Sequence, residues 1–293
     1  MSQLYYHYTD ASTALKILTN NELWLTHTKY LNDSNEGIDV LIYLERYIKN
    51  KEILKLLKFI DSRTEAYTCS FSKKKDLLSQ WRGYCPPEEG YAIGFKSPEK
   101  FRGIMCDEGV SIKGMQTKGE HYCLSRHSHG FEACIYEEEE KEKVSQSMAL
   151  RMEEKYIRLK SDMPEILENL NNCQINTKEF MQRLECDDVW LAQYIYYKYL
   201  FKNETFKEEH EYRFFVTFDS NYNQNPCYRS KGGAFIPYYR YCFGNEDVKK
   251  IIIRTTKTTE KCKQGLEHFL MNNKNMNHAE IDDFIETSNI PFQ

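Results

Sequence analysis

Hydrophobic and polar positions at the start of the chain follow strand-like and helix-like periods in turn. Residues 3–9 form a short aromatic and β-branched run that predicts a strand, and apolar residues at helical spacing follow from Ala14. Residues 22–27 alternate as a strand does, and a turn-rich segment then leads to an amphipathic helix near residues 36–60. The pattern therefore predicts a β-α-β-α opening.

Strand-like runs return at several places farther along the chain. They lie at residues 65–72, 90–95, 131–137, 209–218, 234–239 and 248–254. Asp76 is placed to cap a short helix after the first of these runs. An acidic block, EEEEKEK, is typical of a solvated helix start, since carboxylates suit the positive end of a helix dipole. The pattern is helical from about residue 141 to about residue 203, and a last helix is expected near 258–272.

No Pro-, Gly- or Ser-rich linker divides these elements, so residues 1–293 are interpreted as one elaborated domain. The predicted fold class is α+β, with a mixed, mostly antiparallel sheet, flanking helices and a helical insertion at about residues 138–205. A hydrophobic fraction of 41% and an aromatic fraction of 14% are enough to fill a sizeable core.

The charge balance argues against a global field that recruits nucleic acid or anionic membrane. Forty Lys and Arg residues face 44 Asp and Glu residues, which gives a net charge of -4, although a local basic groove stays open. The start of the chain lacks a basic segment followed by an apolar one, and no apolar run approaches the ~20 residues of a membrane helix. The sequence predicts a cytoplasmic protein without a membrane partner.

The ten cysteines are scattered singly, without a CxxC pair, and are predicted to be reduced and mostly buried. One of them lies with three histidines in the segment HYCLSRHSH at residues 121–129, where zinc ligation is conceivable. The spacing matches no common zinc template, so a polar loop is favoured and no metal is assigned.

Two strands carry the candidate chemistry. In the first strand His7 and Thr9 share one face, because residues i and i+2 of a strand point the same way, and together they offer an imidazole and a hydroxyl. In the late strand Glu209, Glu211 and Arg213 share a face in the same manner, so their charges shift one another's pKa. The alternatives are a core histidine in the first strand and a solvent-exposed ion ladder in the late one.

An aromatic and basic block lies between these two strands in the sequence. Trp81, Tyr84 and Tyr91 offer ring faces to a base or nicotinamide, and Arg82 and residues 73–75 offer cations to phosphates. Core packing for Trp81 and a solvated surface for the lysines are the alternatives. No GxGxxG, Walker, GxSxG or HExxH motif is present, which argues against the commonest nucleotide-binding and hydrolase classes.

The order of motifs resembles a bacterial family known only as domain-of-unknown-function family 2971. The matching motifs are Tyr6-His7-Tyr8-Thr9, Asn32-Asp33 with Glu36, Ser70 to Tyr84, Gly90 to Phe95, and Phe206 to Arg213. The resemblance covers about residues 5–255. It implies a setting like that of phage-defence and toxin genes.

A second resemblance is to ADP-ribosyltransferases of the diphtheria-toxin and poly-ADP-ribose-polymerase type, which combine an H-x-T/S strand with a late E-x-E strand. By that similarity His7 and Thr9 position NAD, Glu211 stabilises an oxocarbenium-like transition state, and Glu209 orients the acceptor. Where the toxin-type motif usually has glycine, this chain has Tyr8. The catalytic residues to expect are Glu211, Glu209 and His7, and the cofactor-binding ones are His7, Tyr8, Thr9, Ser70, Trp81, Arg82, Tyr84 and Arg213.

The leading hypothesis is an NAD-consuming ADP-ribosyltransferase-like or NAD glycohydrolase-like bacterial effector, with NAD as its substrate. One alternative is a nucleic-acid-binding or nucleic-acid-processing effector without NAD chemistry, and another is a non-catalytic partner-binding module. The partners to expect are NAD or another nucleotide, a protein or nucleic-acid acceptor, and a neutralising partner protein.

Overall fold

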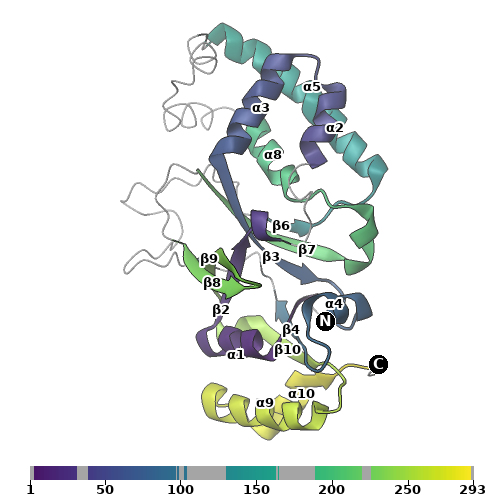
Figure 1. Ribbon diagram of the computed structural model, residues 1–293, viewed down its shortest axis with the longest axis vertical. Coiled ribbons are helices and arrows are strands. Elements are labelled where there is room, and N and C mark those ends of the chain that lie inside the picture. Colours follow the sequence, from purple (N-terminus) through teal and green to yellow (C-terminus); the bar gives the residue numbers. More distant parts are fainter. Residues whose placement is uncertain are drawn as a thin grey trace.

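The computed structural model has a single large sheet with helices gathered at its two ends (Figure 1). The structure describes residues 3–31, 39–96, 98, 102–103, 130–162, 164, 189–219 and 226–291. Its strands are β1 (Leu4–Thr9), β2 (Glu22–His27), β3 (Thr64–Ser72), β4 (Tyr91–Lys96), β5 (Arg102–Gly103), β6 (Gly130–Ala133), β7 (Glu211–Asp219), β8 (Cys227–Lys231), β9 (Ala234–Cys242), β10 (Val248–Ile253) and β11 (Ile285–Thr287).

The α-helices lie between these strands in the sequence. They are α1 (Ala11–Asn20), α2 (Asp39–Tyr47), α3 (Lys51–Arg63), α4 (Leu78–Tyr84), α5 (Glu138–Asp162), α8 (Val189–Lys198), α9 (Thr259–Lys274) and α10 (His278–Phe284). Among the described strands, β10 and β11 pair in parallel and the other pairs are antiparallel. The α+β class with a mostly antiparallel sheet is therefore confirmed.

Local signals explain several of these elements. Asp10 caps α1 by accepting a hydrogen bond of 2.8 Å from the Thr13 backbone, and Asn21 ends the helix in the left-handed conformation. The acidic block begins α5, as its charge pattern predicts. The expected helix at 36–60 is instead two helices, because Asn50 caps a new helix, α3, by accepting from the Glu52 backbone.

The sheet brings the first strand and the late Glu-rich strand close together. Strand β7 pairs with β3 along the whole of one edge, from Thr64 to Ser72. The other edge of β3 is shared, with β2 pairing near Thr68 and β1 pairing at Ser72. Strands β1 and β7 are thus separated in the sheet by β3 alone.

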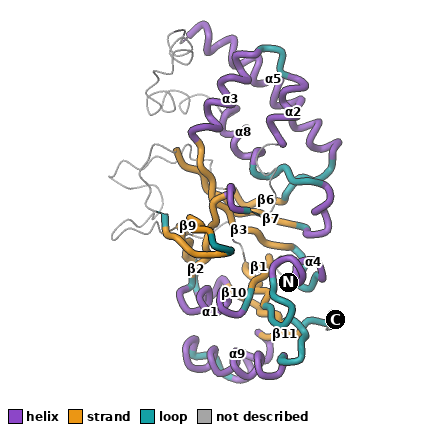
Figure 2. Tube along the Cα trace, viewed as in Figure 1, coloured by secondary structure: helices purple, strands orange, loops and turns teal. Residues whose placement is uncertain are grey.

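Apolar side chains fill three separate cores. The first lies between one face of the sheet and helices α1, α9 and α10, and the second lies among α2, α3, α5 and α8. Figure 2 shows α1 and α9 at one end of the molecule and α2, α3, α5 and α8 at the other. Strand β7 contributes to both, since Phe214 packs in the first core and Phe215 in the second. The third and smallest core packs Trp81 of α4 on Tyr6 and Tyr8 of β1. None of the helices in the described part of the chain has the length and apolar character needed to cross a membrane.

Candidate functional site

Four charged side chains meet where β7 begins. Arg213 donates from Nε to Oε1 of Glu211 over 3.0 Å and from Nη2 to Oε2 over 3.1 Å, so the pair is bidentate. Lys202 donates from Nζ to Glu211 over 2.5 Å and to Glu209 over 2.5 Å. We call Lys202, Glu209, Glu211 and Arg213 the Glu211 cluster. Two acids and two bases compensate one another here, as buried charges must.

The backbone around the Glu211 cluster explains how these groups are brought together. After α8 the chain passes Lys202, forms a 3-10 turn at Glu204–Glu209 and reverses at His210, whose φ is 46°. This reversal folds Lys202 back onto the start of β7. A further hydrogen bond holds Arg213 in place, because its Nη1 donates to the Tyr199 carbonyl over 2.8 Å.

Burial and pairing set the ionisation of the Glu211 cluster. Glu211, Arg213 and Lys202 expose only 3%, 2% and 5% of their surface. Burial alone would raise the pKa of Glu211, but the charges of Arg213 and Lys202 outweigh it and hold that pKa well below its ordinary range. Burial would lower the pKa of Lys202, and the charge of Glu211 raises it instead. Both groups therefore stay ionised at neutral pH.

Hydroxyl groups surround the Glu211 cluster. The Tyr136 hydroxyl accepts from the Glu211 backbone over 3.1 Å, and Ser72 donates to the Glu209 carbonyl over 2.7 Å. Tyr84 of α4 exposes 36% of its surface, and its pKa is raised by burial of the phenol and by the charge of Glu211. Tyr84 is thus a partly exposed residue close enough to Glu211 to feel its charge.

His7 does not face the Glu211 carboxylate, contrary to the expectation that both groups act on the same NAD molecule. Tyr6 pairs with Ser72 and Ser72 pairs with Glu211, and directly opposed residues share a face of a sheet. His7 follows Tyr6, so its side chain points to the other face. Accordingly its Nδ1 donates to the Ser70 carbonyl over 2.9 Å and its ring packs on Phe71. Burial lowers the pKa of His7, which keeps the ring neutral.

Tyr8 and Thr9, which follow His7 on β1, are both buried. Thr9 is buried, and its carbonyl accepts from the Cys85 thiol over 3.3 Å. Tyr8 is also buried and donates from its hydroxyl to the Lys74 carbonyl over 2.8 Å. Both side chains are therefore largely closed to a substrate.

The predicted cofactor-binding residues between β1 and β7 differ in their surroundings, since Trp81 is buried and Arg82 is exposed. Trp81 exposes 1% of its surface, packs its ring against Tyr8 and donates from Nε1 to Asp76, so its faces are not open for stacking. Asp76 is therefore not the helix cap that the sequence predicts. Ser70 pairs with Arg213 and shares the face of the Glu211 cluster, and Arg82 is exposed at the surface of α4.

Sequence reasoning missed Lys202, Tyr136 and Ser72. Nothing in the spacing around Lys202 marks it, because its nine-residue separation from Glu211 is closed by the turn and not by a helix or strand period. The turn itself has a signal, since Asn203 caps it by accepting from the Thr205 backbone.

Other predicted features can be placed only in part. The motif residues Asn32, Asp33 and Glu36 and the segment 121–129 lie outside the described residues. In the ranges that the structure does describe, no group of three His, Cys, Asp or Glu residues is arranged to hold a metal ion. The described cysteines are free thiols, of which Cys69, Cys85 and Cys134 are buried.

These observations define an α+β protein with a buried cluster of compensating charges at the start of strand β7. A family model described as "Protein of unknown function (DUF2971)" matches residues 80–214. This region contains the Glu211 cluster together with Tyr84 and Tyr136, whereas β1 and His7 lie outside it. The match supports the resemblance to that family over a shorter span than 5–255. No curated protein and no solved structure matches the chain.

Proposed function

We propose that the chain is an enzyme that cleaves or transfers the glycosidic bond of NAD or a related nucleotide, with Glu211 at the reacting centre. The observation that carries this proposal is the Glu211 carboxylate itself. Two cations hold it ionised and in a fixed position, and its charge raises the pKa of Tyr84, a partly exposed residue. A preorganised charge of this kind is what stabilises a transition state that develops the opposite charge.

The proposed chemistry takes place at one oxygen of the Glu211 carboxylate. Oε1 of Glu211 accepts a single bond from a described residue, that of Arg213 Nε, and so keeps a lone pair for a ribose hydroxyl. When the bond from C1′ to nicotinamide nitrogen breaks, its electron pair leaves with nicotinamide and positive charge develops on the sugar. Water or a protein or nucleic-acid group then forms the new bond to C1′ and loses a proton.

The roles of the other residues follow from their places. In this proposal Tyr84 borders the substrate, Glu209, which is paired with Lys202, orients the acceptor, and Arg213 and Lys202 act as positioning residues for Glu211. His7 supports the sheet behind β3 in this proposal and does not touch the substrate. A bacterial effector role in phage defence or a toxin system stays a prediction from the family resemblances, and a cytoplasmic location stays a prediction from the sequence.

The two alternatives are less well supported. A surface ion ladder requires exposure of Glu209, Glu211 and Arg213, and these side chains expose 14%, 3% and 2% of their surface. A stacking groove for single-stranded nucleic acid requires an open Trp81 ring, which is buried. Within the lysine run, Lys75 is already paired with Glu286 over 2.8 Å.

The first test compares Glu211→Gln with Glu208→Gln. Incubation of the wild-type protein with NAD and cell extract is expected to release nicotinamide, which chromatography measures. Glu211→Gln keeps the shape and removes the charge, so release is expected to fall by about 100-fold or more. Glu208 is exposed three residues away, and its replacement by Gln is expected to leave release unchanged.

Two results would contradict the proposal. One is the absence of nicotinamide release from the wild-type protein with NAD under any acceptor preparation. The other is equal release by the wild type and a folded Glu211→Gln variant. Far-ultraviolet circular dichroism and a melting curve for each variant separate lost chemistry from lost structure.

A further inference from the structure

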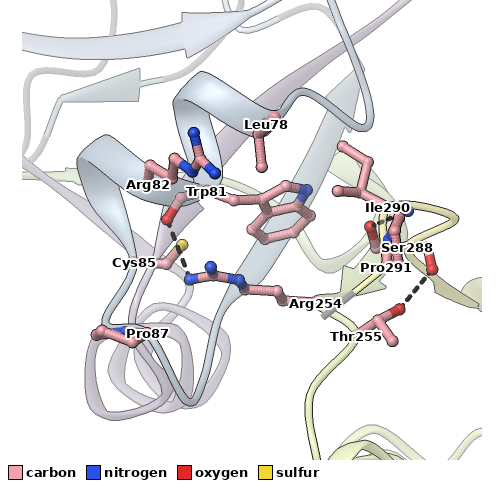
Figure 3. Close-up of a pocket in the computed structure, with 10 residues that line it drawn as sticks. All are labelled: Leu78, Trp81, Arg82, Cys85, Pro87, Arg254, Thr255, Ser288, Ile290 and Pro291. Carbon is pink, nitrogen blue, oxygen red and sulfur yellow. Dashed lines mark hydrogen bonds between the residues drawn. The ribbon is translucent and has the colours of Figure 1, made fainter. Parts of the chain in front are cut away.

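A cavity of about 260 Å³ lies on the side of α4 that carries Trp81 and Arg82. It forms between the end of α4, the residues after β10 and the segment after β11 (Figure 3). Its size is just below the ~300–1,000 Å³ that drug-sized ligands occupy, which suits a small molecule. Trp81 contributes to its wall, whereas Tyr84 belongs to the surround of the Glu211 cluster.

Arg254 gives this cavity a defined chemistry. Its Nη1 donates to the Pro86 carbonyl over 2.8 Å and to the Trp81 carbonyl over 3.3 Å, and Figure 3 shows it reaching from the end of β10 toward α4. These two carbonyls fix the plane of the guanidinium. Its Nε and Nη2 donate to no described residue, and they form the edge that binds a carboxylate or phosphate through two parallel bonds.

The remaining wall suits an anion with a compact apolar body. Leu78, Pro87, Ile290 and Pro291 supply apolar surface, and Arg82 adds a second cation to the lining. The Asp76 carboxylate contacts the lining but is directed at donors of its own. It accepts from Ser288 Oγ over 2.6 Å, Asn289 N over 2.8 Å and Trp81 Nε1 over 2.7 Å.

Those same bonds make the cavity preformed. Asp76 ties the segment after β11 to α4, and Thr255 adds a bond of 2.6 Å from its hydroxyl to the Ser288 carbonyl. The walls are therefore joined before any ligand enters, so that binding does not have to order them.

We propose that this cavity, with Arg254 as its anchoring residue, binds a small organic oxyanion that carries a compact apolar group. A carboxylate and a phosphomonoester share the required chemistry, since each offers two oxygens to the Arg254 edge. The proposal is independent of the NAD proposal, because it uses none of the Glu211 cluster.

Calorimetric titration of the full chain with benzoate and with phenyl phosphate tests this site. Benzyl alcohol serves as the neutral analogue. At least one of the anions is expected to bind, and the ratio of their affinities identifies carboxylate or phosphate as the preferred group. Arg254→Lys keeps the charge but loses the two-nitrogen edge, so the affinity is expected to fall about tenfold or more. Arg158→Gln removes an exposed charge on α5 and is expected to have no effect.

A second variant keeps the proposal testable if Arg254→Lys unfolds. Ile290→Trp fills the cavity from the opposite wall without touching the guanidinium, and it is expected to abolish binding. The proposal is overturned if neither anion binds at millimolar concentration, or if benzyl alcohol binds as tightly as the anions. Unchanged affinity in a folded Arg254→Lys or Ile290→Trp variant would overturn it equally.

Discussion

Replacing Arg213 with methionine is expected to lower the free energy of unfolding by about 3–5 kcal/mol, as breaking a buried ion pair generally does. Arg213 exposes 2% of its surface and provides two of the hydrogen bonds that Glu211 receives. Without it, Lys202 is the cationic partner that Glu211 keeps among the described residues, and the Tyr199 carbonyl loses the bond from Arg213. Urea denaturation followed by circular dichroism measures the change.

A surface ion pair provides the matched control for this experiment. Lys55 and Glu52 lie 2.8 Å apart on α3 but expose 66% and 42% of their side chains. Lys55→Met is expected to change the free energy of unfolding by less than about 1 kcal/mol, because solvent screens such a pair. The account of the Glu211 cluster would be wrong if Arg213→Met cost no more than Lys55→Met.

The same cluster links stability to the proposed chemistry. A carboxylate that is buried, ionised and bound on both oxygens costs the fold a desolvation penalty, which Arg213 and Lys202 compensate. Glu211→Gln keeps a hydrogen-bonding group in place, whereas Arg213→Met removes one. A comparison of the two variants therefore separates the effect of the charge at Glu211 on stability from the effect of Arg213, which holds it in place.

The sequence predicts which residues of one strand share a face, but it does not predict the register between strands. Alternation correctly places Glu211 and Arg213 on one face of β7, and the apolar spacing from Ala14 correctly predicts α1. Whether His7 shares that face depends on the register between β1, β3 and β7. A shift of one residue in this register would move the His7 side chain to the other face of the sheet, and the pairing of Tyr6 with Ser72 fixes the register.

Contacts across the fold account for the other differences. Trp81 could be interpreted as a stacking residue or a core residue, and the choice depends on Tyr8, which lies 73 positions earlier and packs its ring against the indole. Asp76 has the residue type of a helix cap, but its carboxylate bonds to Trp81 and to Ser288 near the other end of the chain. Neither partner can be inferred from local propensity.

His27 is expected to make the fold sensitive to mild acid. Its side chain is buried, and its Nδ1 accepts a hydrogen bond of 3.1 Å from the Lys29 backbone, which only a neutral ring with an unprotonated Nδ1 can do. The ring also packs edge-on against Tyr67. Burial, with a smaller effect from the charge of Lys29, lowers the pKa of His27 to about 4.

The sign of the pH effect follows from this lowered pKa. Between an unfolded pKa of about 6.5 and the folded value of about 4, the unfolded chain binds a proton that the folded chain does not. The free energy of unfolding is therefore expected to fall by up to about 3 kcal/mol as the pH is lowered through that window, and this contribution levels off below it. Urea midpoints measured between about pH 7 and about pH 4.5 determine the slope.

His27→Asn isolates this contribution from that of the other titrating groups. The asparagine Oδ1 can accept the Lys29 backbone bond in place of Nδ1, but it does not titrate. The variant is expected to lose less stability than the wild type over the same pH window, while His7, whose pKa is also lowered by burial, contributes equally to both proteins. Parallel pH dependences for the two proteins would show that His27 accepts a proton in the folded state without cost, and would reject this account of its burial.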